Sequence, residues 1–269
     1  MTETGPVEAL EGTTYPARPY RLCREKVNEF ISATGDDSDR WTQAAPPGFA
    51  AALLFVTAPD LLDDARLSGG IVHGDQTFLW HSPLRLESEL EVTGSVDRVR
   101  VRGEVAFITF SLTADNDGDR VVEGKSTFLV GGATDLDEVP VGYVDERGRT
   151  STVGTTLPAA RSASRADLVR YAAATRDWNP IHWDHDSAVA AGLGGVVVHG
   201  LLQSAWLTQV AAAAGDGDRP LASARFRYTS LLRPAQQATI EGDLSGDKLE
   251  LRLVADGATT VTGRFEVIR

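Results

Sequence analysis

The stretch R-A-D-L-V-R-Y-A-A-A-T-R-D at Arg165–Asp177 has an earlier counterpart in the chain, R-E-K-V-N-E-F-I-S-A-T-G-D at Arg24–Asp36. Both stretches end in the pattern Ala-Thr-x-Asp. A second pair follows in the same order, F-L-W-H-S-P-L-R at Phe78–Arg85 and F-R-Y-T-S-L-L-R at Phe226–Arg233. Repeats that recur in the same order indicate two copies of one structural unit.

Length and composition set the first limits. The 269 residues suffice for two domains of ordinary size, and 42% hydrophobic residues can form two cores. The net charge of -12 argues against nucleic acid as a partner, because phosphate backbones are bound through Lys and Arg. A single cysteine, Cys23, excludes an internal disulfide. With no visible signal peptide and no long apolar run, we expect a cytoplasmic protein that does not bind a membrane.

Apolar and polar residues alternate near the end of each copy, as in strands of antiparallel sheets with one buried face. The apolar positions are Leu84, Leu86, Leu90 and Val92 in the first copy, and Leu249, Leu251, Leu253, Val261, Phe265 and Val267 in the second. Turn motifs occur at Asn116–Gly118 and Ala255–Gly257. Each copy is therefore predicted to end in antiparallel hairpins.

Helices are fewer, and each copy has one that is almost entirely apolar. Ser164 and Asp167 form a capping box that predicts a helix to about Thr175. Val197–Gly215 is apolar on nearly all sides, which indicates a buried helix, and its counterpart is Pro46–Phe55. Each copy is thus predicted to contain, in order, a helix, a loop, a buried helix and a run of strands.

The segment D-W-N-P-I-H at Asp177–His182 brings together groups suited to acid-base chemistry. A carboxylate and an imidazole five positions apart do not face each other along a helix. Pro180 forces a turn after the helix, so that His182 folds back toward Asp177 and the two hold one water between them. Asn179 fixes the turn through its side chain. Asp36 is followed by no such segment, so the first copy is expected to have kept the scaffold and lost the chemistry.

This segment, followed by Ala188 and by V-H-G-L-L at Val198–Leu202, resembles the signature of the MaoC-like (R)-specific enoyl-thioester hydratases and dehydratases. The resemblance implies an α+β double hot-dog fold, with two antiparallel curled sheets that each wrap around a central buried helix. It implies reversible hydration of trans-2-enoyl thioesters to (3R)-hydroxyacyl thioesters. Asp177 would be the base, His182 would orient the water, and the backbone N–H of Gly200 would hold the charge on the thioester oxygen.

One position departs from the family pattern. Members usually carry Gly before the catalytic Asp, as Gly35 does here, whereas the second copy has Arg176. Either the backbone at Arg176 is ordinary, or its side chain faces a phosphate or carboxylate of the substrate. We take three residues as substrate-binding or orienting residues, namely Arg176, Asn179 and His199. His199 also fits a structural role as a hydrogen-bonded residue. His73, in a second V-H-G, is expected to precede a strand and to have no catalytic role.

The division of the chain follows from the repeat. Residues 1–135 are predicted to form a degenerate, non-catalytic N-terminal hot-dog, residues 136–160 a linker, and residues 161–269 the catalytic hot-dog. No metal or other cofactor is expected, because coenzyme A or an acyl carrier protein is part of the substrate. The oligomeric state is open, with a homodimer as one option.

Other interpretations of the same residues remain. Asp177 fits a simple helix cap, and His182, Asp184, His185 and Asp186 could be read as a metal cluster, although zinc prefers ligands on a rigid element. A thioesterase shares the fold class and would not need His182. A non-catalytic acyl-thioester-binding subunit would bind the ligand without turnover.

Overall fold

The computed structural model describes residues 6–64, 66–67, 71–131, 157, 159–244 and 246–269. The first repeat contains β1 (Arg18–Leu22), α1 (Arg24–Thr34), α2 (Ala50–Leu62), β2 (Ile71–Trp80), β3 (Ser88–Arg102), β4 (Val105–Asn116) and β5 (Asp119–Val130). The second contains β6 (Ala159–Arg161), α3 (Arg165–Thr175), α4 (His185–Ala190), α5 (Gly200–Ala212), β7 (Leu221–Tyr228), β8 (Ala238–Asp243), β9 (Lys248–Ala255) and β10 (Ala258–Val267). Short 3₁₀ helices span Val7–Leu10, Pro47–Phe49 and Pro180–His182.

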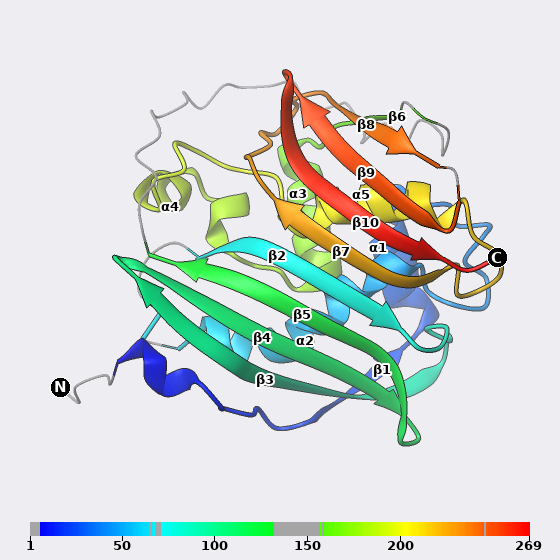
Figure 1. Cartoon of the computed structure of the whole chain (residues 1–269), viewed down its shortest axis with the longest axis horizontal. Helices are drawn as coiled ribbons and strands as arrows, with labels where there is room; N and C mark the ends of the chain where they lie inside the picture. Colours follow the sequence, from blue (N-terminus) through cyan, green and yellow to red (C-terminus); the bar gives the residue numbers. More distant parts are fainter. Residues whose placement is uncertain (1–5, 65, 68–70, 132–156, 158, 245) are drawn as a thin grey trace.

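The strands form one antiparallel sheet in the order β1-β3-β4-β5-β2-β7-β10-β9-β8-β6. The order has a twofold symmetry, because each strand of the first repeat has an equivalent at the same distance from the centre. The centre is the β2–β7 pair, in which Thr77 faces Arg225. Two curled half-sheets therefore join edge to edge, and the predicted double hot-dog architecture appears as one continuous sheet (Figure 1).

The two central helices, α2 and α5, lie behind the sheet (Figure 1). Every residue of α5 from Leu201 to Ala212 is buried, and so is every residue of α2 from Ala50 to Ala58. The helices α1 and α3 pack against each other, and the rings of Phe30 and Tyr171, which are equivalent in the repeat, lie 6.2 Å apart. The buried-helix predictions are confirmed.

The predicted hairpins are confirmed at both turns. Asp117 and Gly118 join β4 to β5 with φ of 52° and 88°, and Asp256 and Gly257 join β9 to β10 with φ of 48° and 79°. Two consecutive residues with positive φ are the mark of type I′ turns, whose twist matches that of the strands.

One strand start was wrong. Leu84 and Leu86 alternate with polar residues, but β3 begins only at Ser88. Glu87 has φ of 61°, which breaks the extended conformation immediately before the strand. The predicted linker, residues 136–160, lies outside the described residues except for residues 157, 159 and 160, and the last two belong to β6. None of the helices in the described part of the chain has the length and apolar character needed to cross a membrane.

Candidate active site

Asp177 is placed by the end of α3. The capping box of Ser164 and Asp167 starts this helix as predicted, and Arg176 ends it in the left-handed conformation with φ of 66°. The Asp177 backbone N–H then donates to the Thr175 hydroxyl at 3.3 Å. Asp177 is 7% exposed, so it is buried directly after the end of the helix.

The left-handed conformation excludes one of the two interpretations of Arg176, that of an ordinary backbone. The backbone is not ordinary at this position, because a side chain disfavours positive φ. The residue is exposed. Arg176 thus occupies a conformation that suits glycine, and its side chain does not line the cavity described below.

The Asn-Pro turn holds His182 in place. Asn179 accepts a hydrogen bond from the Ile181 N–H through its side-chain oxygen, at 3.4 Å. Its side-chain nitrogen donates to the backbone oxygen of Ile71 at 2.9 Å, so this turn is tied to β2 of the other repeat. His182 is 8% exposed, and its Nδ1 lies 2.8 Å from the Val197 carbonyl oxygen. A carbonyl only accepts, so Nδ1 carries the proton and Nε2 is left with a lone pair.

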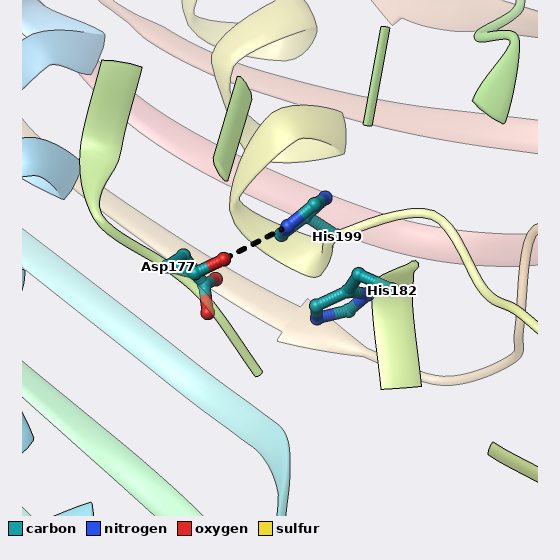
Figure 2. Close-up of side chains that lie close together, drawn as sticks. All are labelled: Asp177, His182 and His199. Carbon is teal, nitrogen blue, oxygen red and sulfur yellow. Dashed lines mark hydrogen bonds between the residues drawn. The ribbon is translucent and has the colours of Figure 1, made fainter. Parts of the chain in front are cut away.

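His199 contacts the ring of His182 and the backbone oxygen of Asp177 (Figure 2). Its ring stacks on that of His182, with centroids 3.7 Å apart and an interplanar angle of 24°. Its Nε2 donates to the backbone oxygen of Asp177 at 3.3 Å. The ring of Tyr171 lies 4.9 Å away from the His199 centroid. His199 is fully buried and is not part of the cavity wall, so it orients Asp177 and His182 rather than facing a ligand.

Gly200 begins α5 beside Tyr228. A Cβ atom at Gly200 would lie 2.9 Å from the Tyr228 ring, so no other residue fits without a shift. Tyr228 is held by a hydrogen bond of 2.8 Å between its hydroxyl and that of Ser204. The first N–H groups of a helix have no partner within the helix, so the backbone at Gly200 offers donors to a ligand.

Asp177, Asn179, His182 and Gly200 meet on one cavity of about 90 Å³. Tyr228 adds to the wall from the same repeat. The second repeat also supplies Ile181, Val197, Val198, Leu201, Gln203, Ser230 and Leu231. The first repeat contributes Phe55 and Leu62 on α2, Ile71, Val72 and His73 on β2, and Phe128 on β5. The cavity therefore lies where the two repeats meet, and the first repeat supplies mostly apolar side chains.

Burial sets the protonation states. It raises the pKa of Asp177 to about 7 and lowers the pKa of His182 to about 4. It also lowers the pKa of His199 well below its ordinary value. At neutral pH both imidazoles are neutral, and the carboxyl group is close to its midpoint, which suits a group that takes up and releases a proton.

Asp177 and His182 are close enough for one water to bridge them. Three atoms lie within 4.8 Å of one another, namely one carboxylate oxygen of Asp177, one ring nitrogen of His182 and one ring nitrogen of His199. A water can bridge two acceptors at this separation with hydrogen bonds of ordinary length. Its two hydrogens would go to the carboxylate and to Nε2 of His182.

Among the residues that the structure describes, these three are also the group whose geometry would allow a metal ion to be held. Imidazole lone pairs lie in the ring plane, and the stacked rings of His182 and His199 do not direct theirs to one point. His199 already uses Nε2 to bind the Asp177 backbone. The absence of a metal cofactor therefore stays a prediction. The alternative metal cluster of His182, Asp184, His185 and Asp186 is not among the groups of described residues that could hold an ion. Asp184 instead accepts from the Ser187 N–H and caps α4.

Asp36 has a different environment from Asp177. Its carboxylate accepts hydrogen bonds from the Asp37 N–H at 2.8 Å and from the Trp41 indole N–H at 3.1 Å. Trp41 is 2% exposed. The carboxylate thus anchors a buried indole, and the sequence has no histidine between Asp36 and Gly48.

His73 was misjudged from the sequence. It lies within β2 rather than before a strand, and it lines the cavity. Tyr228 was not predicted as a site residue either. No local pattern identifies these two, because they reach the cavity only through the pairing of β2 with β7.

Sequence comparison identifies related proteins. Residues 146–263 match the family described as MaoC like domain. The chain is 32% identical over 123 residues to a UPF0336 protein of Streptomyces coelicolor, and the alignment covers 36% of this chain and 82% of that protein. It is 39% identical over 61 residues to the mitochondrial 3-hydroxyacyl-[acyl-carrier-protein] dehydratase of Arabidopsis thaliana, covering 23% of this chain and 37% of that protein.

Structure comparison gives matches along the whole chain. A MaoC-like dehydratase superposes with a TM-score of 0.78 at 21% identity, covering 97% of this chain and 99% of that one. A Mycobacterium tuberculosis protein described as a double hot-dog fold gives 0.65 at 14% identity, with 96% of each chain covered. An acyl-ACP thioesterase from Bacteroides thetaiotaomicron gives 0.56 at 11% identity, covering 95% of this chain and 97% of that one. At these identities the matches confirm the double hot-dog fold.

Proposed function

Because the chain belongs to the MaoC-like dehydratase family, we propose that it catalyses the reversible hydration of trans-2-enoyl thioesters to (3R)-hydroxyacyl thioesters. The observation that carries the proposal is the meeting of Asp177 and His182 with the N-terminus of α5 on one cavity. The relative from Arabidopsis thaliana, named as a 3-hydroxyacyl-[acyl-carrier-protein] dehydratase, supports the reaction class.

The reaction starts from a water held by two acceptors. The carboxylate of Asp177 accepts one hydrogen, and Nε2 of His182 accepts the other, which leaves an oxygen lone pair directed at the substrate. As this oxygen bonds to the β-carbon, Asp177 takes one proton from the water. The electrons of the double bond move to the thioester oxygen.

The charge on that oxygen needs donors. The Gly200 N–H lies at the positive end of α5 and would stabilise the developing oxyanion. Asp177 then gives its proton to the α-carbon. The second water hydrogen remains on the new hydroxyl, so one water has been added across the double bond and both catalytic groups have returned to their starting state.

The two repeats have different tasks in this proposal. Residues 161–269 supply the reacting groups, and residues 1–135 supply an apolar wall from Phe55, Leu62 and Phe128 that suits an acyl chain. The hydrogen bonds of Asp36 to Trp41 and Asp37 support a non-catalytic role for the first repeat. The reaction needs no further cofactor, since coenzyme A or an acyl carrier protein enters as part of the substrate.

The fold alone does not choose between a hydratase and a thioesterase, since an acyl-ACP thioesterase superposes on this chain. The two reactions differ in their products. We therefore propose incubation with crotonyl-CoA while enoyl absorbance and free thiol are both measured. A hydratase removes the absorbance without releasing thiol, a thioesterase releases thiol, and a binding subunit changes neither.

A further inference from the structure

A β-bulge in β2 turns His73 toward the cavity. His73 pairs with Phe128 and Asp75 with Thr127, so Gly74 is an extra residue opposite β5. A Cβ atom at Gly74 would lie 2.4 Å from Leu129 Cδ1, so the end of the Leu129 side chain would have to move for a larger residue. Beyond the bulge, Gln76, Phe78 and Trp80 are buried. Strict alternation would point His73 to the opposite face from these three, and the extra residue places it on their side.

The ring of His73 is held between two aromatic rings. Its centroid lies 4.9 Å from that of Phe128 and 5.3 Å from that of Tyr228. The cavity wall that includes His73 also includes Asp177 and His182. This histidine therefore belongs to the first repeat but faces the reacting groups of the second.

One nitrogen of His73 lacks a partner. Nε2 is buried and forms no hydrogen bond with any part of the chain that the structure describes. Burial lowers the pKa of His73 to about 4, and hydrogen bonds to Gln76 and the Asp75 backbone oppose this effect. Burial thus favours the neutral ring, in which one nitrogen carries a proton and the other a lone pair. A buried polar nitrogen without a hydrogen-bond partner is unfavourable, and a ligand group can supply the partner.

The water of the reaction does not meet this need. Its two hydrogens are used by Asp177 and by Nε2 of His182, as described for the proposed function. The neighbours of His73 within the first repeat's part of the wall are apolar, among them Ile71 and Phe128. The polar wall residues of the second repeat, among them Gln203 and Tyr228, form no hydrogen bond with Nε2 either. A group of the bound substrate is therefore a candidate partner for this nitrogen.

We propose that His73 is a substrate-binding residue supplied by the N-terminal half, whose Nε2 accepts a hydrogen bond from a donor group of the bound acyl thioester. The donor is either a hydroxyl on the acyl tail or an amide N–H of the pantetheine arm. This inference rests on the proposed function for the choice of ligand, but binding tests it without turnover.

The test measures Kd by calorimetry for pentanoyl-CoA and 5-hydroxypentanoyl-CoA, which have no double bond to hydrate. The proteins are the parent chain, His73→Phe, His73→Gln and the control His81→Gln. His73→Phe keeps a ring of similar size without the acceptor, and His73→Gln keeps an acceptor. His81 is a half-exposed histidine of the same half that pairs with Glu123. Thermal unfolding of each variant checks that it folds.

We expect His73→Phe to raise Kd at least about fivefold, the scale of one neutral hydrogen bond. His73→Gln should recover part of the affinity, and His81→Gln should match the parent. A loss confined to 5-hydroxypentanoyl-CoA identifies the tail hydroxyl as the donor, and an equal loss for both ligands identifies the pantetheine amide.

A folded His73→Phe variant with Kd within twofold of the parent for both ligands would overturn the inference. So would a parent chain that binds neither ligand. A third outcome separates the two claims. If the parent binds these ligands, His73→Phe binds them more weakly, and crotonyl-CoA is not hydrated, then the proposed function fails and the assignment of His73 stands.

Discussion

Gly35 and Arg176 end equivalent helices of the two repeats, and both have φ of 66°. Each is followed by an aspartate, Asp36 or Asp177. The geometry of the helix end has thus been kept in both repeats, although only one has the residue that adopts it without strain. A left-handed conformation costs a residue with a side chain roughly 1–2 kcal/mol.

Arg176→Gly should therefore stabilise the protein. Relief of strain exceeds the extra flexibility that glycine gives the unfolded chain, so the free energy of unfolding should rise by roughly 0.5–1 kcal/mol. Denaturant unfolding measures this change, and the hydration rate should stay within a few-fold because Arg176 does not line the cavity. A less stable variant would show that the Arg176 side chain makes contacts that outweigh the strain.

The hydration rate should depend on pH through Asp177. The base must be ionised to take a proton from water, and burial raises the pKa of Asp177 to about 7. We therefore expect kcat/KM for hydration to rise with pH up to about 7 and then level off, with a loss of about tenfold per pH unit well below that value. His182, with its pKa lowered to about 4, stays neutral throughout this range. A rate that is constant from about pH 5 to pH 8 would contradict the role of Asp177.

His182→Gln should lower kcat at least about a hundredfold, the usual scale for a group that assists proton transfer. Glutamine keeps polarity but does not reproduce an imidazole whose Nδ1 is bound to Val197 and whose Nε2 faces the water. Single-turnover kinetics with crotonyl-CoA measures the loss, and a binding titration checks that the substrate is still held. Near-normal kcat would remove His182 from the mechanism.

The product should have one configuration. In the proposed mechanism, Asp177 and His182 hold a single water on one face of the double bond, so the oxygen would be added from that face alone. Given the family, chiral analysis of hydrated crotonyl-CoA should find the 3R hydroxyl. Mainly 3S product would contradict the assignment of the reaction.

Much of the fold could be predicted from the sequence because its signals are local. The capping box at Ser164, the apolar length of α5 and the two type I′ turns each depend on a few neighbouring residues. The start of β3 was predicted too early, because Glu87 adopts a positive φ that its residue type does not indicate. Alternation alone does not reveal such a break.

The site could be predicted only in part for a different reason. Asp177, Asn179, His182 and Gly200 belong to two motifs close in the sequence, and the structure brings them to one cavity. His73 reaches the same cavity through the β2–β7 pairing and the bulge at Gly74. Both depend on contacts between residues far apart in the chain, which no local pattern records.

The most direct measurement compares Asp177→Asn with Asp36→Asn in the hydration of crotonyl-CoA. The two aspartates follow equivalent helices, so each substitution replaces one carboxyl group with an amide at the same place in its repeat. We expect Asp177→Asn to lower kcat at least about a hundredfold. The kcat of Asp36→Asn should stay within a few-fold of the parent value, because the Asp36 carboxylate accepts a hydrogen bond from the Trp41 indole. Equal losses in the two variants, or a normal kcat in Asp177→Asn, would contradict a catalytic site confined to the second repeat.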